Sequence, residues 1–343
     1  MRKLLNVLYV TTQGAYLSRD GEAVLVRVGE ENRLRVPVHT LEGLVCFGQV
    51  SCSPFLLHLC AQHKVAVSFL TEHGRFQARV VGPISGNVLL RREQYRRADR
   101  EGDAATVARA LVLAKIANCR TGLLRSARER PEGAEACLLQ GAAARLLGVL
   151  ARVEKAAAVD TIRGLEGEAA NVYFDAFDAM ITAPKPAFGF RGRNRRPPLD
   201  NVNALLSFLY TVLVHDVVGA LESVGLDPAV GFLHCDRPGR PSLALDLAEE
   251  FRPFLADRLV LALMNRRQVN ADGFVKSEAG GVWMSDDTRK EVIAAWQKRK
   301  QDEIQHPFLE ERIAIGLLPY VQALLLARHL RGDLDAYPAF FWR

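Results

Sequence analysis

The chain changes character near residue 89, and this change constrains its fold more than any other feature of the sequence. Before that point, short runs of strand-forming residues alternate with turn residues. After it, Ala, Leu, Glu and Arg recur with helical periodicity, and all four are good helix formers. The sequence therefore predicts an α+β protein: a small β-rich N-terminal domain, a roll or sandwich, followed by a larger all-α C-terminal domain. We expect the two domains to cover residues 1–85 and 86–343.

The β-rich region contains clear turn and helix signals. Asp20 and Gly21 stand between two apolar segments, which predicts a β-hairpin. Pro37 follows an alternating segment, so this strand is expected to lie at a sheet edge or to end there. Ser53 followed by Pro54 predicts the N-terminus of a short helix that reaches Lys64.

The second region is predicted to consist of long helices separated by proline and glycine. The predicted helices cover residues 103–127, 134–157, 166–181, 200–224, 242–265, 286–300 and 309–332. The longest interruption is the proline-rich stretch 184–198, which we expect to form a loop.

Composition and charge are compatible with a nucleic-acid partner and disfavour a membrane partner. The net charge of +6 permits a nucleic-acid partner without requiring one. No uncharged apolar stretch approaches the roughly 20 residues of a membrane-spanning helix, so no membrane partner is expected. The N-terminal segment has no small-residue cleavage site, and we expect a cytoplasmic protein.

Three short stretches contain residues that could carry chemistry. In the first, Glu166 stands between Leu165 and Gly167, at the start of the helix predicted for residues 166–181. The helix dipole would stabilise a carboxylate there. The alternative is that Glu166 only complements the dipole.

In the second stretch, His234 follows the apolar pair Phe232-Leu233 and precedes a turn rich in Pro, Gly and charge. An imidazole at such a position leaves the core and faces a cleft. The alternative is a structural histidine.

The third stretch places acids on a helix that Ser242 could cap. Asp246, Glu249 and Glu250 are spaced i, i+3 and i+4, so one helical face is expected to hold all three. Stacked carboxylates repel one another, and a bound cation would reverse that repulsion. The alternative is a solvated acidic face with Arg252 nearby.

Two carboxylates and an imidazole together favour a divalent metal ion. This mixed oxygen and nitrogen set suits Mn²⁺ and tolerates Mg²⁺. Zinc is disfavoured, because no cysteine or second histidine has ligand spacing near the set.

The three stretches, in this order, resemble the CRISPR-associated integrase family, the enzymes of spacer acquisition. The matching segments are Glu166-Gly167, Gly231–His234 and Ser242–Pro253, and the helix that contains Tyr210 also looks like the family's helix before the histidine. The closing segment Tyr337–Arg343 resembles the subtype I-C branch. The resemblance extends over nearly the whole chain.

The resemblance implies that Glu166, His234 and Glu249 bind Mg²⁺ or Mn²⁺, with Asp246 as a further catalytic acid beside them. It also implies a homodimer that joins a small ferredoxin-like CRISPR-associated partner dimer. The implied reaction inserts prespacer DNA into a CRISPR repeat by attack of a 3′-hydroxyl group on a phosphodiester, on double-stranded and branched DNA. The alternatives are a non-catalytic DNA-binding scaffold and a metal-dependent nuclease of general DNA repair.

A cationic loop with aromatic neighbours is the first candidate for DNA contact. Its basic residues are Lys185, Arg191, Arg193, Arg195 and Arg196; Arg237, Arg240, Arg252 and Lys276 are further candidates near the proposed site. The alternative is a flexible, solvated loop.

Overall fold

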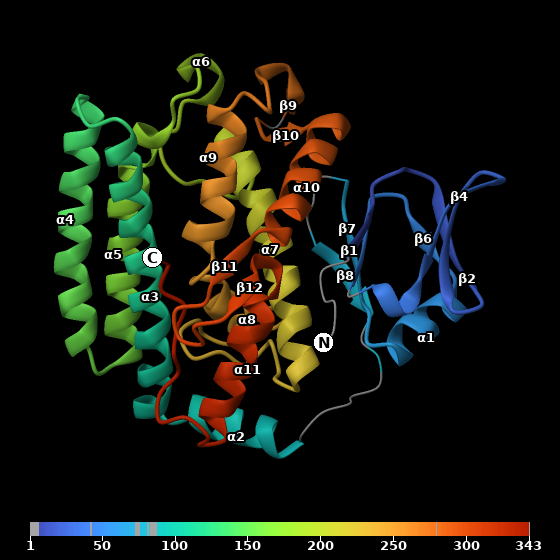
Figure 1. The fold of residues 1–343 in the computed structure, drawn as a ribbon, viewed down its shortest axis with the longest axis horizontal. Coiled ribbons are helices and arrows are strands. Elements are labelled where there is room, and N and C mark those ends of the chain that lie inside the picture. Colours follow the sequence, from blue (N-terminus) through green and yellow to red (C-terminus); the bar gives the residue numbers. More distant parts are fainter. Residues whose placement is uncertain are drawn as a thin grey trace. The chain divides into compact units, whose positions relative to one another are not determined.

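The computed structural model describes residues 7–41, 43–72, 76–80, 82, 88–278 and 280–342. The chain forms two compact units (Figure 1). The first unit consists of residues 1–86, 286–303 and 314–317, and the second of residues 87–285, 304–313 and 318–343. A β-rich N-terminal region followed by a mostly helical region confirms the predicted fold class.

The first unit contains two four-stranded sheets. In one sheet β1, β5 and β7 run parallel and β8 is antiparallel to β7; in the other β2, β3 and β4 are antiparallel and β6 pairs with β2. The strands are β1 (Val7–Val10), β2 (Ala15–Asp20), β3 (Ala23–Val28), β4 (Glu31–Pro37), β5 (Gly43–Phe47), β6 (Ser51–Cys52), β7 (Ala66–Leu70) and β8 (Phe76–Val80). The helices are the short η1 (Val38–Thr40), α1 (Pro54–Gln62), α10 (Asp286–Gln301) and the short η5 (Ile315–Leu317).

The two sheets share one hydrophobic core. Leu17 and Val24 come from one sheet, Leu44 and Val67 from the other, and Leu56 of α1 joins them. Apolar side chains on both sheets therefore leave water together, which is how a small sandwich is stabilised.

The local signals in the β-rich region are confirmed. Strands β2 and β3 form the predicted hairpin, and Gly21 has the positive φ (+59°) that the turn requires. Strand β4 lies at a sheet edge and ends at Pro37. The Ser53 side chain accepts a hydrogen bond from the Leu56 N–H at 3.2 Å and caps α1.

The second unit is built from helices. Helices α3, α4 and α5 pack against one another, and α7 packs against α8 and α11. The elements are α2 (Val88–Ala98), α3 (Glu101–Glu129), α4 (Ala134–Lys155), α5 (Val159–Asp175), η2 (Phe177–Met180), α6 (Lys185–Phe188), α7 (Asn201–Val224), α8 (Ser242–Ala248), the π-helix η3 (Arg252–Asp257), α9 (Arg258–Asn265), η4 (Ala271–Gly273), β9 (Phe274–Lys276), β10 (Val282–Met284), β11 (Glu303–Gln305), β12 (Arg312–Ala314) and α11 (Leu318–Leu330). Strands β9 and β10 pair with each other, as do β11 and β12.

Helices α4 and α7 have the length and apolar composition of membrane-spanning helices. Both pack against other helices of the unit, and Leu205, Leu209 and Leu213 of α7 are fully buried. A helix in the core of a helical unit is apolar because its neighbours bury it, so this composition alone does not indicate a membrane span.

Two helices begin well away from their predicted starts, because glycines and apolar periodicity were misleading guides. Helix α5 begins at Val159 and runs through Gly164 and Gly167. The expectation that Glu166 lies at a helix N-terminus is therefore wrong, and the dipole argument no longer applies to it. The last helix begins at Leu318 instead of residue 309, because the chain before it forms β12 and a short helical turn.

The helix predicted for residues 242–265 is divided into three pieces. Helix α8 ends at Ala248, a turn follows, and the π-helix η3 leads into α9. Pro253 lies in the first turn of η3, where its missing N–H does not interrupt the hydrogen-bonding pattern. Ser242 is not the cap: the residue at that position is Pro241, and the Ser242 hydroxyl donates to the Cys235 carbonyl at 3.2 Å.

The C-terminal segment is fastened to the core of the helical unit by buried polar groups. The Asn118 side chain donates to the carbonyls of Glu250 and Phe340 at 2.8 and 2.9 Å and accepts from the Trp342 N–H at 2.7 Å. The Glu250 carboxylate accepts from the Tyr337 hydroxyl and from the Phe340 N–H, both at 2.6 Å. These bonds connect the C-terminal segment Tyr337–Trp342, called the tail below, to Asn118 of α3 and to Glu250, which directly follows Glu249.

We expect Asn118→Ala to destabilise the protein by about 3 kcal/mol or more, because it leaves three buried backbone groups without partners. Urea unfolding measures the change. The control is Gln140→Ala, which removes an exposed amide on α4 and is expected to change the free energy of unfolding by less than about 0.5 kcal/mol. Equal stabilities of the two variants would contradict the anchoring role of Asn118.

Candidate metal centre and nucleic-acid interface

Two carboxylates and one ammonium group meet where α3, α5 and the end of α8 come together. Lys115 of α3 forms an ion pair with Glu166 of α5 and a second ion pair with Glu249, at 2.7 Å between Nζ and Oε2. Both carboxylates therefore contact the same nitrogen atom. The structure brings Glu166 and Glu249 together, although the sequence places them on different helices.

Glu249 is a buried, ionised carboxylate. Its side chain is 2% exposed, and Arg252 forms an ion pair with its second oxygen. Burial raises the pKa of this carboxyl, but Arg252, Lys115 and His234 outweigh burial and lower the pKa to about 2. The Arg252 guanidinium in turn lies over the Tyr210 ring, 5.0 Å from its centroid.

Asp246 holds the ring of His234 in one orientation. Its Oδ1 lies 2.6 Å from Nδ1 of His234 and accepts the His234 N–H at 3.0 Å. Its Oδ2 accepts the N–H groups of Phe232 and Leu233 at 2.6 and 2.9 Å. With both oxygens bonded, Asp246 is suited to orient His234, and Nε2 of the ring is left for a ligand.

The three acids of the third stretch do not share one helical face, so that expectation is wrong. Asp246 bonds His234, Glu249 pairs with Lys115, and Glu250 bonds the tail. The reason is that α8 ends before Glu249, and the turn that follows breaks the helical spacing on which the expectation depended.

The residues present fit a divalent ion by their chemistry. Among the described residues no group of three or more His, Cys, Asp or Glu side chains is arranged to hold a metal ion, and Lys115 and Arg252 contact the two carboxylates. Oε2 of Glu249 is nevertheless buried without a hydrogen-bond donor in good geometry; its contact with Lys115 is ionic. Glu166 and His234 remain 20% and 22% exposed, so the centre is open to solvent on that side.

The sequence analysis missed Lys115, although the sequence contains a signal for it. Lys115 is the one charged residue in the apolar run from Leu111 to Cys119, and it is buried on α3. Burial lowers the pKa of Lys115, but Glu249 and Glu166 raise it above its usual value. A lone lysine inside an apolar run predicts a buried acidic partner, because an unpaired buried charge is costly.

A second buried polar cluster lies next to the carboxylates. Asp257 accepts hydrogen bonds from the hydroxyls of Tyr210 at 2.7 Å and Tyr173 at 3.1 Å. Arg193 stacks on the Tyr210 ring, 5.2 Å from its centroid, and donates to Asn203 Oδ1 at 2.7 Å. The cluster joins α5, α7 and η3 by side-chain contacts that no local pattern in the sequence predicts.

The basic residues predicted to contact DNA fall into two groups. Lys185, Arg193 and Arg252 already have protein partners, in Asp178, Asn203 and Glu249 respectively. The others form no ion pair with the described part of the chain and are at least partly exposed: Arg191, Arg195, Arg196, Arg237, Arg240 and Lys276. Only the second group is free to meet a phosphate without first breaking a protein contact.

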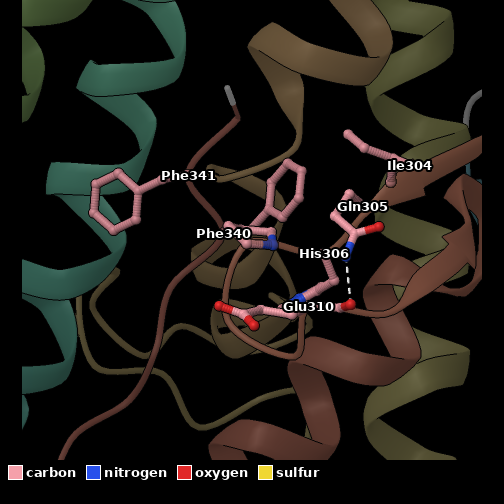
Figure 2. A pocket seen from close by; sticks show the side chains of 7 residues that line it. Ile304, Gln305, His306, Glu310, Phe340 and Phe341 are labelled. Carbon is pink, nitrogen blue, oxygen red and sulfur yellow. Dashed lines mark hydrogen bonds between the residues drawn. The ribbon is translucent and has the colours of Figure 1, made fainter.

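A cavity of about 450 Å³ near the tail is a separate feature from this centre (Figure 2). It is lined by Ile304, Gln305, His306, Pro307, Glu310, Phe340 and Phe341. Nδ1 of His306 accepts from the N–H groups of Phe308 and Leu309, and Nε2 lies 3.0 Å from the Gln322 amide oxygen. Both ring nitrogens are thus occupied, and burial lowers the pKa of His306. His306 therefore has a structural role: it holds the backbone of the turn at Phe308 and Leu309.

The comparisons with known proteins decide the family. The family described as CRISPR associated protein Cas1 matches residues 8–298. A CRISPR-associated endonuclease Cas1 of Chlorobaculum tepidum is 58% identical over 343 residues, with complete coverage of both chains. The chain belongs to the Cas1 family. The resemblance of the three stretches to the CRISPR-associated integrases is thereby confirmed at the level of the family.

Two solved structures show the same fold. A casposase bound to integration product aligns with a TM-score of 0.84 at 20% identity, over 98% of this chain and 94% of that one. A chain of a Cas6-RT-Cas1–Cas2 complex also aligns with a TM-score of 0.84, at 23% identity over 99% of this chain and 36% of the other. The chain therefore shares its fold with a casposase and with a chain of a larger complex.

We expect Asp257 to make the stability depend on pH between about 4 and 6. Burial raises the pKa of Asp257 to about 6, although Tyr210 and Tyr173 lower it by hydrogen bonding. The folded state therefore keeps a proton that the unfolded chain releases near pH 4. The resulting stabilisation, about 3 kcal/mol, is complete below pH 4 and is lost as the pH rises through 6.

Asp257→Asn removes this titration. The parent should lose stability from pH 4 to 6 and the variant should not, so the free energy of unfolding of the variant minus that of the parent should rise over this range. Urea unfolding at a series of pH values measures it, with Asp272→Asn as the exposed control. A parent-to-variant difference that stays constant from pH 4 to 6 would exclude Asp257 as the source.

Proposed function

We propose that this Cas1 protein is a metal-dependent DNA endonuclease and integrase that inserts spacer DNA into a CRISPR array. The observation that carries the proposal is the meeting of Glu166 and Glu249 at one point, in a chain 58% identical over its full length to a protein named as an endonuclease. His234, whose ring is oriented by Asp246, would complete the donor set.

Glu166, Glu249 and His234 would hold Mg²⁺ or Mn²⁺. When bound, such an ion activates an oxygen nucleophile and neutralises charge on the attacked phosphate. Asp246 keeps the His234 ring in the orientation that exposes Nε2. In the integration reaction, a DNA 3′-hydroxyl oxygen bonds to phosphorus as the bond to the leaving 3′-oxygen breaks. With water as the nucleophile, the same chemistry is hydrolysis.

The proposed partners follow from the family and from the solved relatives. We expect a homodimer that binds prespacer and repeat DNA and joins a small Cas2-type dimer, since a chain of similar fold is part of a Cas1–Cas2 complex. The tail from Tyr337 to Trp342, which the structure anchors in the core, supports the subtype I-C assignment only through its sequence. We also propose a cytoplasmic location.

One observation favours a non-catalytic DNA-binding scaffold. Lys115 and Arg252 already balance the charge of both carboxylates, which is what pairing acids in a scaffold would do. An integrase should cleave DNA when a metal ion is added, whereas a non-catalytic scaffold should not. A nuclease of general DNA repair would instead act without preference for CRISPR-repeat DNA.

His234→Ala should reduce Mn²⁺-dependent cleavage of branched DNA and strand transfer into repeat DNA by about 100-fold or more, because it removes a ligand. Asp246→Asn keeps the ring but weakens its orientation, so a loss of about 10-fold to 100-fold is expected. His58→Ala, an exposed histidine of α1, is the control and should retain full activity. A parent without Mn²⁺-dependent activity, or an undiminished His234→Ala variant, would favour the scaffold.

Neutralising Arg195 and Arg196 together should weaken DNA binding and lower the slope of log K against log salt by about two, about one for each lost phosphate contact. Fluorescence anisotropy with duplex DNA at several salt concentrations measures both quantities. The charge-matched control replaces Arg128 and Arg145 with serine, two exposed arginines of α3 and α4. Equal slopes in the two double variants would remove the loop from the interface.

A further inference from the structure

Lys115 occupies the place between the two acidic residues of the centre. Its side chain is 10% exposed and its ammonium nitrogen contacts both Glu166 and Glu249. The residues beside it on α3, Leu111, Val112 and Ile116, are fully buried in the apolar core. The carboxylates are thus the groups that keep this ammonium in a buried position.

The charges of the four groups joined by these ion pairs are balanced without any added ion. Glu166 and Glu249 contribute two negative charges, and Lys115 and Arg252 contribute two positive charges. Buried charges are tolerated when they are paired in this way. A divalent ion that enters the set adds two positive charges, so it meets repulsion unless a cation already there withdraws.

The two cations differ in their freedom to withdraw. The Arg252 guanidinium is held over the Tyr210 ring, beside the stacked Arg193. The Lys115 ammonium is a point charge on a flexible four-carbon stem, and its partners are the two carboxylates that a metal ion would take. Withdrawal of Lys115 therefore requires the smaller rearrangement.

We propose that Lys115 is the internal counter-cation of this centre: it holds Glu166 and Glu249 together without metal and leaves them when a divalent ion binds. This inference rests on the proposed function. It makes Lys115 a competitor of the metal ion and a positioning residue for its two carboxylate ligands.

The displaced ammonium needs a new anion, and a DNA phosphate at the centre supplies one. DNA should therefore tighten metal binding, and metal should tighten DNA binding by the same factor, because linkage between two ligands is reciprocal. Without the Lys115 charge this part of the coupling is lost.

The test measures Mn²⁺ affinity without DNA, from the electron paramagnetic resonance signal of free Mn²⁺, in the parent, Lys115→Met, Lys115→Arg and Glu166→Gln. Lys115→Met keeps an unbranched side chain and removes the charge, so it should bind Mn²⁺ at least about tenfold more tightly than the parent. In EDTA its Tm should be lower than that of the parent, and Mn²⁺ should raise its Tm by more. Lys115→Arg keeps the charge and should not gain affinity.

The outcomes separate the two proposals. If Glu166→Gln binds Mn²⁺ as the parent does, the metal centre itself is wrong. If Glu166→Gln loses affinity while Lys115→Met binds no more tightly than the parent, only the counter-cation is wrong.

A second measurement uses the unmodified protein, in case Lys115→Met does not fold. Mn²⁺ should increase the rate at which acetic anhydride labels Lys115, relative to the exposed Lys276, as read by mass spectrometry. Labelling of Lys115 that Mn²⁺ leaves unchanged or slows would overturn the proposal.

Discussion

The ion pairs around Glu249 are the interaction on which the functional part of this structure depends. A carboxylate that is 2% exposed stays charged only because two cations contact it. Those cations come from α3 and from η3, so the charge requirement fixes how these elements approach each other. An unpaired charge in the core is costly, so these ion pairs oppose any movement that separates the two elements.

Three acids within five residues perform three separate tasks because the helix that carries them stops. Asp246 lies within α8 and orients His234; Glu249 follows the end of α8 and joins the ion pairs. Glu250 turns to the C-terminal segment, where burial raises its pKa to about 7 although Tyr337, Phe340 and Gln322 lower it by hydrogen bonding. A continuous helix would have stacked these groups on one face and made them repel one another.

The sequence predicted those parts of the fold that local interactions determine. The hairpin at Gly21, the cap at Ser53 and the helix from Asn201 to Val224 were predicted within one or two residues, since turn geometry, capping and apolar periodicity act over short distances. The start of α5 and the break after α8 were not predicted. Each depends on tertiary contacts, which carry helices through glycines and stop them without a local signal.

The candidate site was predictable in composition but not in arrangement. The sequence named the acids and the histidine, and it could not show that Lys115 and Arg252 contact the acids, because those contacts join separate helices. It also gave no sign that the tail is bound to α3 through Asn118, one turn beyond Lys115. Since Glu250 binds the same tail and directly follows Glu249, the tail restrains both α3, which carries Lys115, and the turn that carries Glu249. The geometry of the centre therefore depends on a segment that contributes none of its charged groups.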